Sequence, residues 1–312
     1  MRAALAAGVD LSTRVGSVSL PNPVMTAAGT AGHGAELGAY LDLAELGAVV
    51  VKSLSARPWP GNPPPRLHPT PAGMLNSVGL QGPGVEAWLE HELPALEAAG
   101  ARVVVSIWGR TVAEYAAAAA LLAAAPAAVA AVEVNVSCPN TEDKSRMFAH
   151  SPIATAEVIA AAAAAGRPRW AKLSPNTDRL VEVAAAARDA GAEAVTLVNT
   201  LLGMVIDVEA RRPRLGGGGG GLSGAAIHPV AVRAVYDCAA ALPDLAIVGV
   251  GGVTNGVEAV ELLLAGASAV QVGTASFADP RAPLRVLEGL GAWCRRRGVR
   301  GLDELIGGAH AT

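Results

Sequence analysis

Apolar runs of four to eight residues alternate with alanine-rich stretches of helical length along most of the chain. Such runs are typical of buried strands, and the longer stretches favour helices. Strict alternation predicts a parallel sheet, and eight units close into a barrel more readily than they form an open sheet. We therefore predict an α/β fold, a (β/α)8 TIM barrel. The expected strands are residues 24–28, 48–52, 102–107, 129–136, 169–173, 194–199, 245–250 and 269–272, and the expected helices are residues 35–46, 84–99, 112–124, 153–165, 177–190, 228–241, 255–265 and 282–297.

Segments outside this alternation are expected to cover the two ends of the barrel. Residues 12–20 predict a hairpin that plugs the N-terminal end, and no repeat or linker divides the chain, so we expect one domain over residues 1–312. Segments 53–83, 138–151 and 201–227 are too long for ordinary loops, and each follows a strand. We expect them at the C-terminal face, where long loops are usually functional. The third contains six consecutive glycines, which predict a mobile flap or a disordered hinge.

Composition and charge exclude several classes of protein. Apolar residues make up 52% and charged residues 16%, which allows a large core. The formal net charge of −3 argues against a nucleic-acid binder or a binder of anionic membranes. No stretch of about 20 residues is apolar without a charge, a proline or a glycine cluster, so we expect no membrane span. Three widely spaced cysteines and no secretory leader predict a reduced, cytoplasmic chain without a cysteine-based metal site.

The residues at the ends of the expected strands predict the chemistry of the barrel mouth, because these ends converge on one site. Apart from Val136, they are Lys, Asn, Ser, Cys, Thr or Gly, without histidine or carboxylate. That set does not fit metal hydrolysis or paired-carboxylate catalysis. It fits the binding of a planar, anionic, polar molecule. The residues are Gly29, Lys52, Ser53, Ser106, Asn135, Val136, Ser137, Cys138, Lys172, Asn199, Thr200, Gly251, Gly252, Gly273 and Thr274.

Each of these signals also has a structural interpretation. Glycines after strands are often turn residues, but two pairs after the seventh and eighth strands favour a phosphate site. One lysine ending an apolar strand is often a structural charge. Two at the same mouth, Lys52 and Lys172, favour stabilisation of negative charge on a ligand.

Cys138 and Asn76 are likewise open to two interpretations. A free cysteine is often a small buried apolar residue, which is what we expect of Cys238 and Cys294. Cys138 instead lies on a predicted turn between Ser137 and Pro139, where a thiolate could act as a general base. Asn76 is either a surface turn residue or part of a loop folded over the site.

The motifs together resemble the class 1 dihydroorotate dehydrogenases, most closely the B-type catalytic subunit. The resemblance covers roughly residues 20–291 and includes the run Asn135-Val136-Ser137-Cys138-Pro139-Asn140. The other stretches that carry it are residues 22–23, 27–29, 61–63, 65–66, 73–81, 171–176, 199–201, 221–224 and 265–270, with Gly273-Thr274.

The resemblance implies a TIM barrel that holds FMN at its C-terminal mouth and oxidises dihydroorotate to orotate. It implies that Cys138 is the base that removes a proton from carbon 5, with Lys52 and Ser137 in the catalytic set. The implied substrate contacts are Lys52, Asn76, Val78, Gly79, Leu80, Asn135, Asn140, Asn199 and Thr200. The implied FMN contacts are Ala28, Gly29, Lys52, Ser53, Ser106, Asn135, Lys172, Val198, Ser223, Gly224, Gly251, Gly252, Gly273 and Thr274.

The resemblance also implies partners and shows departures from the family pattern. B-type members work with an electron-transfer subunit that carries FAD and an iron–sulfur cluster, so we expect a homodimer or a heterotetramer and no nucleic-acid or membrane partner. Trp108 replaces a small residue near the expected flavin, His228 replaces a lysine, and residues 141–144 lack an expected glycine. These departures leave open a related dehydrogenase acting on another dihydropyrimidine or a specialised metabolite. A ligand-binding barrel without turnover is the alternative outside enzymes.

Overall fold

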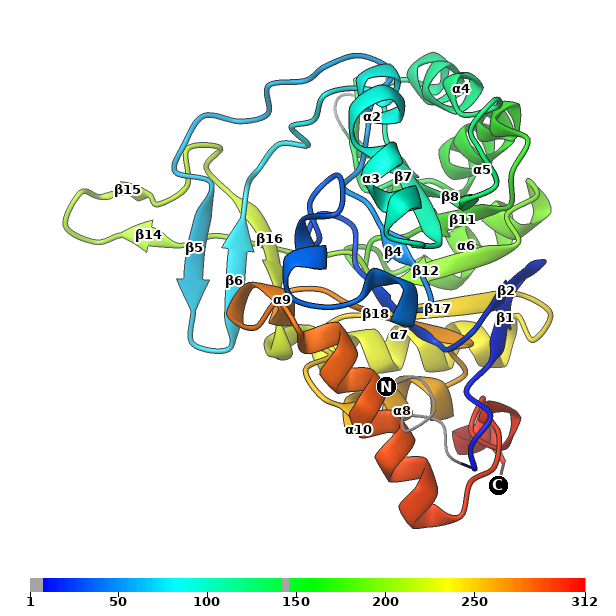
Figure 1. The fold of residues 1–312 in the computed structure, drawn as a ribbon. Helices are drawn as coiled ribbons and strands as arrows, with labels where there is room; N and C mark the ends of the chain where they lie inside the picture. Colours follow the sequence, from blue (N-terminus) through cyan, green and yellow to red (C-terminus); the bar gives the residue numbers. More distant parts are fainter. Residues whose placement is uncertain (1–7, 142–145, 312) are drawn as a thin grey trace.

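A computed structural model of the chain describes residues 8–141 and 146–311. Within these residues, eight strands form one sheet whose neighbours pair in parallel, at the positions of the eight predicted strands. Helices surround the sheet, as Figure 1 shows. The TIM-barrel prediction is confirmed. In sheet order, the strands are β3 (Val24–Thr26), β18 (Ala269–Val272), β17 (Ala246–Val250), β12 (Ala194–Leu197), β11 (Arg169–Lys172), β8 (Val129–Asn135), β7 (Val103–Ile107) and β4 (Val49–Val50).

The barrel closes between β3 and β4 through a few specific bonds. Met25 and Ala48 form an isolated parallel bridge, and the Thr26 amide donates to the Ala48 carbonyl over 3.3 Å. The hydroxyl of Thr26 continues the contact, because it accepts from the Val50 amide at 2.8 Å and donates to the Val50 carbonyl at 3.3 Å. A side chain thus adds to the few backbone hydrogen bonds at the seam.

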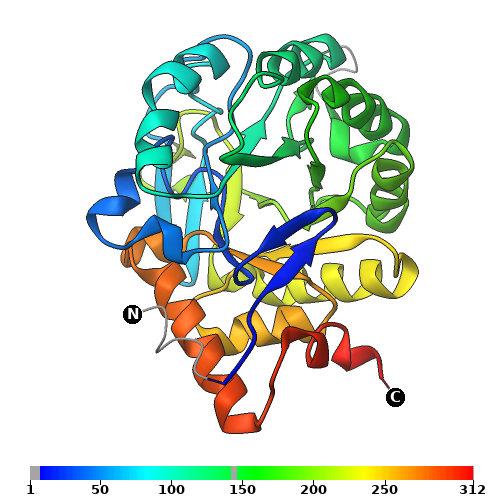
Figure 2. The same cartoon turned by 45° about the vertical axis from the view of Figure 1, so that its right-hand side comes forward.

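A hairpin of β1 (Thr13–Val15) and β2 (Val18–Leu20) covers one end of the barrel, as predicted. Figure 2 shows it in dark blue, lying across the barrel. Val15, Val18 and Leu20 point inward and pack with apolar residues from the barrel strands, among them Trp170 and Val104. These contacts exclude water from the lower barrel and provide hydrophobic stabilisation.

The predicted helix at residues 35–46 is wrong. The structure has two short 3-10 turns there, η1 (Glu36–Ala39) and η2 (Leu43–Glu45). The carboxylate of Glu36 accepts from the His33 and Gly34 amides, and Asp42 caps a new turn by accepting from the Ala44 amide. Side chains of this type offer the backbone local bonds that compete with a continuous helix.

The other predicted helices are present with shifted ends. Residues 84–99 are divided into α2 (Val85–His91) and α3 (Leu93–Ala98), where Pro94 occupies the first turn of the second helix. A short α9 (Ala275–Ala278) was not predicted. The remaining helices are α4 (Val112–Leu121), α5 (Pro152–Ala161) with η4 (Ala162–Ala165), α6 (Leu180–Asp189), α7 (His228–Ala241), α8 (Gly256–Leu264) and α10 (Ala282–Arg297).

Two of the three long segments join in an antiparallel sheet beside the barrel mouth. Its strands, in sheet order, are β13 (Leu201–Gly203), β16 (Gly220–Ser223), β6 (Gly73–Asn76) and β5 (Leu67–Thr70). The hairpin of β14 (Ile206–Asp207) and β15 (Arg212–Pro213) extends the same arm, at the left of Figure 1. The third segment contributes a short pair, β9 (Pro139–Asn140) with β10 (Arg146–Met147).

The six-glycine run does not form the disordered hinge that its composition suggests. Gly220 and Gly221 belong to β16, and Gly221 pairs with Asn76 of β6. A Cβ atom on Gly216 would lie 2.3 Å from the Pro63 carbonyl oxygen, and one on Gly221 would lie 2.1 Å from the Thr200 hydroxyl. The glycines therefore allow backbones to approach closely rather than move freely.

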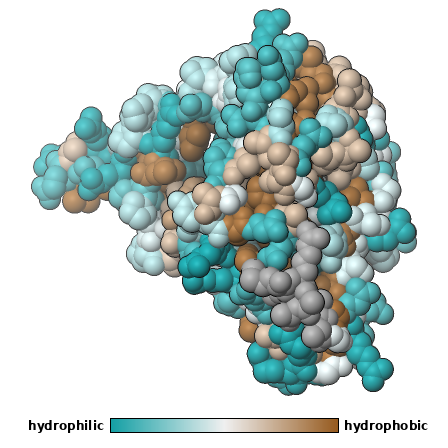
Figure 3. Space-filling model, viewed as in Figure 1, coloured by the Kyte–Doolittle hydropathy of each residue, from teal (hydrophilic) through white to brown (hydrophobic). Residues whose placement is uncertain are grey.

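Apolar side chains are exposed on this arm. Leu202, Met204, Ile206 and Val208 each expose about half or more of their surface. In Figure 3 the protrusion at the left is mostly hydrophilic, with brown patches among the teal residues. Across residues 8–141 and 146–311, the structure contains no helix that is both long and apolar enough to span a membrane.

Removing the apolar plug is expected to destabilise the barrel. Leu20 exposes 2% of its surface, so Leu20→Ala leaves a cavity and lowers the free energy of unfolding by about 2–5 kcal/mol. The neighbouring Ser19 faces solvent, and Ser19→Ala should change it by less than about 0.5 kcal/mol. Urea denaturation measures both variants, and equal losses would contradict the plugging role of the hairpin.

Candidate active site

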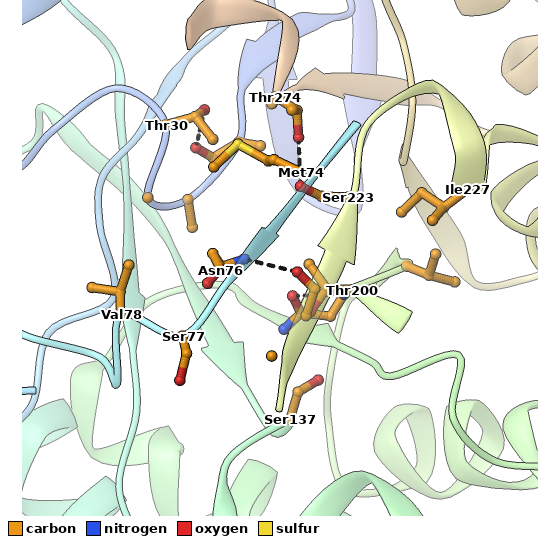
Figure 4. Close-up of a pocket in the computed structure, with 18 of the residues that line it drawn as sticks. Thr30, Met74, Asn76, Ser77, Val78, Ser137, Thr200, Ser223, Ile227 and Thr274 are labelled. Carbon is orange, nitrogen blue, oxygen red and sulfur yellow. Dashed lines mark hydrogen bonds between the residues drawn. The ribbon is translucent and has the colours of Figure 1, made fainter. Parts of the chain in front are cut away.

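A cavity of about 560 Å³ lies at the C-terminal mouth of the barrel. The sheet of β13, β16, β6 and β5 forms one wall, and Figure 4 shows Asn76 on β6, while Thr200 lies just before β13. Most predicted site residues converge there, although they come from positions spread over the whole chain. Those lining the cavity are Ala28, Gly29, Lys52, Ser53, Asn76, Val78, Gly79, Leu80, Asn135, Ser137, Lys172, Val198, Asn199, Thr200, Ser223, Gly224, Gly251, Gly252, Gly273 and Thr274.

The barrel strands build this cavity in layers. Side chains two residues apart on a strand point the same way, so each strand contributes to the interior at every second residue. The lower layer is apolar and includes Val50, Val104, Ala131, Trp170, Ala194 and Ala269. Two residues further along the same strands, the next layer is polar: Lys52, Ser106, Glu133, Lys172, Thr196 and Gln271.

Glu133 is the main residue that the sequence interpretation missed, because a carboxylate was not expected at the site. It is fully buried, and its Oε2 atom accepts from Gln271 at 2.7 Å and from Thr196 at 3.1 Å. Its Oε1 atom lies 3.5 Å from the Lys172 ammonium nitrogen. The signal was present in the sequence, since Glu133 precedes Asn135 by two residues on one strand.

Amides and hydroxyls at the mouth form a connected chain of hydrogen bonds. The hydroxyls of Ser53 and Ser106 are 2.8 Å apart, and the Asn135 amide donates to Ser53 at 3.4 Å. Asn199 donates to the side-chain oxygen of Asn135 at 3.1 Å, and the Thr200 amide donates to Asn199 at 3.0 Å. These bonds fix the orientation of the amides before any ligand binds. Ser106 belongs to this chain beneath the cavity but does not line it.

Cys138 lies behind the cavity wall rather than on its lining. Its side chain is almost fully buried, and its thiol donates to the Asn135 carbonyl at 3.4 Å. The hydroxyl of Tyr115, from α4, donates to the same carbonyl at 2.6 Å. Burial raises the pKa of Cys138 to about 12, while the hydrogen bond from Tyr115 and the charge of Lys52 act in the opposite direction. The thiol is therefore protonated at neutral pH in this state.

Lys52 places an ammonium group inside the cavity. Burial lowers its pKa, Cys138 opposes that shift, and the charge of Lys172 adds to it. Gly29 makes room for the side chain, because a Cβ atom on Gly29 would lie 3.3 Å from the Lys52 nitrogen. Two lysines on separate strands therefore present positive charge to the same space.

The glycines after β17 form a compact turn at the N-terminus of α7. Gly252 has φ +71°, and a Cβ atom there would lie 2.7 Å from the Cβ of His228 and 2.9 Å from the Gly224 carbonyl oxygen. His228 braces the turn, because its Nδ1 is 2.8 Å from the Gly251 carbonyl. Nearby, Thr274 donates to the Ser223 hydroxyl at 2.8 Å (Figure 4). Exposed backbone amides at a helix N-terminus favour an anion.

Known proteins resemble this chain over almost its whole length. A family model described as dihydroorotate dehydrogenase matches residues 10–293. This chain belongs to the dihydroorotate dehydrogenase family. A relative from Desulforudis audaxviator is 48% identical over 305 residues, which cover 97% of this chain and 99% of the relative. It is named dihydroorotate dehydrogenase B (NAD(+)), catalytic subunit. The resemblance inferred from the motifs is thereby confirmed.

Two further relatives from the dihydroorotate dehydrogenase family differ in the electron acceptor that their names give. A relative from Geotalea uraniireducens is also named dihydroorotate dehydrogenase B (NAD(+)), catalytic subunit, and is 46% identical over 96% of this chain and 97% of the relative. One from Solibacter usitatus is 46% identical over 96% of this chain and 98% of the relative. It is provisionally named dihydroorotate dehydrogenase A (fumarate). Similar identity thus accompanies names with different electron acceptors.

Trp108, one of the departures from the family pattern, does not line the cavity. It is buried against Trp59, with ring centroids 5.9 Å apart. Trp59 donates through its indole nitrogen to the Gly79 carbonyl at 3.0 Å, and the Arg110 guanidinium lies 4.5 Å from the centroid of its ring. Trp108 therefore packs behind the cavity wall and, through Trp59, supports the cavity segment at Gly79.

Other predicted features fall at the edge of the described residues. Asn140 lies on β9 and pairs through its backbone with β10, and nothing is described of its side chain. Of the loop at residues 141–144, all but Thr141 lies outside the described residues.

Further residues that line the cavity were not predicted. They are Ala27, Thr30, Leu67, Met74, Ser77, Met147, Ser174, Asn176, Leu202, Gly203, Gly217, Gly219, Gly220, Gly221, Ile227, Val250 and Phe277.

A side chain at position 252 is expected to destabilise the compact turn. Gly252→Ala adds both backbone strain and a collision with His228, so the free energy of unfolding should fall by about 3 kcal/mol. Gly166 has a similar φ of +61° but open space around it, and Gly166→Ala should cost about 1 kcal/mol. Chemical denaturation separates the two effects. Equal costs would show that strain alone explains the glycine at position 252.

Proposed function

We propose that this chain catalyses the FMN-dependent oxidation of dihydroorotate to orotate in pyrimidine biosynthesis. One observation carries the proposal. In a member of the dihydroorotate dehydrogenase family, a single cavity brings together two lysines, a chain of oriented amides, a glycine turn and the turn that holds Cys138. The proposal extends to the catalytic, substrate-binding and FMN-binding roles named from the motifs, and to one FMN-binding domain spanning the chain.

The cavity suits FMN in size and in the chemistry of its lining. Its volume of about 560 Å³ lies in the range of small-molecule sites. Gly251, Gly252, Gly273 and Thr274 would hold the phosphate, because the backbone approaches closely there beside the N-terminus of α7. Lys172 would lie beside the part of the flavin that becomes negative on reduction. When bound, FMN supplies the acceptor for a hydride.

The amides of the chain would bind and orient the substrate ring. Asn135 and Asn199 are already tied to each other, and Asn76 projects from β6 on the opposite wall. Together they offer donors and acceptors to ring carbonyl and N–H groups. Lys52 would pair with the substrate carboxylate, because its ammonium group reaches the cavity.

Cys138 would remove the proton from carbon 5 as a hydride leaves carbon 6. The carbon–hydrogen bond at carbon 5 breaks, its electrons form the new ring double bond, and the proton passes to the sulfur. In the structure the thiol is protonated and donates to the Asn135 carbonyl, so it has to lose this proton to solvent, and the resulting thiolate has to turn from the carbonyl towards the substrate. Ser137 precedes Cys138 in the chain and lines the cavity, and it would take part in this rotation of the Cys138 side chain.

We also propose a second chain that accepts the electrons. The printed names of the relatives from Desulforudis and Geotalea, catalytic subunits that use NAD(+), support this proposal. Exposed Leu202 and Phe277 line the cavity, so apolar surface is available beside it. Two assemblies stay predictions: a heterotetramer with a subunit that carries FAD and an iron–sulfur cluster, and a homodimer without that subunit. A cytoplasmic location also stays a prediction.

Anaerobic stopped-flow absorbance tests the proposed reaction. Dihydroorotate should bleach the flavin of the FMN-loaded protein, and Cys138→Ala should slow this reduction by about 10²–10⁴-fold because the base is lost. Cys238→Ala is the matched control, since Cys238 is also buried but lies on α7. Unchanged kinetics in Cys138→Ala would contradict Cys138 as the base, and an unmodified protein whose flavin is not reduced by any dihydropyrimidine would favour a barrel without turnover. Reduction by another dihydropyrimidine but not by dihydroorotate would favour a different substrate.

The reduction rate is expected to rise with pH. Burial raises the pKa of Cys138 to about 12, so the thiolate, which is the active form of the base, grows about tenfold per pH unit below that value. The rate constant for flavin reduction, measured in anaerobic buffers from about pH 6 to 9, should therefore increase without a fall. A rate that decreases over this range would contradict a thiolate base.

A further inference from the structure

The carboxylate of Glu133 is completely buried in the barrel, and the mechanism proposed above makes no use of it. Burying a charge is costly unless it is paired and hydrogen-bonded. Glu133 meets that requirement with its Oε2 atom through Gln271 and Thr196, and its Oε1 atom faces Lys172. Within the described residues, Oε1 has no hydrogen-bond partner. The pairing with Lys172 is therefore electrostatic and leaves the oxygen free of competing donors.

The strands that carry these residues show why the carboxylate cannot move away. Glu133 belongs to β8 and Gln271 to β18, and three strands separate these two in the sheet order. Their 2.7 Å hydrogen bond consequently crosses the barrel interior. Thr196, on β12, holds the same oxygen from a third direction. The carboxylate is thus anchored on several sides, and its position relative to Lys172 is fixed by the barrel itself.

The charge balance at the cavity floor depends on this anchored carboxylate. Lys172 lines the cavity, whereas Glu133 does not. Gln271 offers a second oxygen to the ammonium group at 3.5 Å, but it carries no charge. With Glu133 ionised, the pair is neutral. Without Glu133, Lys172 would present a full positive charge to the cavity, and charges interact strongly where water is excluded.

We infer that Glu133 is a positioning residue that holds Lys172 at the cavity floor and, by offsetting its charge, sets how strongly the site favours reduced flavin. The inference rests on the proposed function, because it requires FMN in this cavity. Reduction adds negative charge to the flavin. A cation at its edge favours the reduced form, and an anion behind that cation weakens the preference.

The midpoint potential of bound FMN tests the inference through net charge. Glu133→Gln changes the pair from neutral to +1, and should favour reduced flavin at least tenfold, a shift of about +30 mV for a two-electron couple. Lys172→Met changes it to −1 and should shift the potential in the opposite direction. The double variant is neutral again, so its potential should return close to that of the unmodified protein. Anaerobic titration against redox dyes measures all three.

Thr196→Val is the matched control. It removes one hydrogen bond to Glu133 but leaves both charges. The equilibrium ratio of reduced to oxidised flavin should therefore change by less than about threefold, which corresponds to a shift of about 15 mV in the midpoint potential. If Glu133→Gln does not fold, the comparison of Lys172→Met with the double variant still tests the inference. The double variant restores a neutral pair, so its midpoint potential should return towards that of the unmodified protein.

Two results would overturn the inference: an unchanged potential in Glu133→Gln, or a double variant whose potential stays as low as that of Lys172→Met. Both differ from failure of the proposed function, which would appear in the unmodified protein as FMN that dihydroorotate does not reduce.

Discussion

Alternation along the barrel strands is the constraint on which the structure depends. Because successive side chains point to opposite faces, a strand reaches the barrel interior once every two residues. The same eight strands therefore supply an apolar layer at one level and a polar layer at the next. Trp170 and Lys172 show the change most clearly, since one step of two residues leads from the sealed core to the floor of the cavity.

The polar layer is stable only because its members satisfy one another. Glu133, Lys172, Thr196 and Gln271 are almost fully buried, and removing one partner of a buried ion pair typically costs about 3–5 kcal/mol. The apolar hairpin and lower layer lie next to this network and offset its cost by excluding water. Stability and the cavity consequently depend on the same residues, since Lys172, which must be paired with Glu133 when buried, also lines the cavity.

Much of the barrel could be predicted because its signals are local. Apolar runs located the eight strands, and the residues that follow them identified the polar residues contributed to the cavity by the strand ends. The helix at 35–46 failed because Glu36 and Asp42 bond to nearby amides, a competition that periodicity does not reveal. The sheet of β16 and β6 could not be predicted, because it pairs segments separated by about 145 residues. Glu133 was missed because a single carboxylate in an apolar strand does not indicate its partners.

The glycine run has a consequence for how this chain can change during evolution. A low-complexity segment is usually free to drift or change in length, because few contacts depend on it. Here a Cβ atom on Gly216, Gly217, Gly220 or Gly221 would come within 2.5 Å of a neighbouring atom, whereas Gly218 has open space around it. Gly218 nevertheless has φ +81°, which strains any side chain, so the neighbouring Gly219, where a Cβ atom would lie 3.4 Å from the Gly203 carbonyl oxygen, is the position that best tolerates one. A segment that looks repetitive is in fact sterically constrained position by position, because it helps to build the cavity wall.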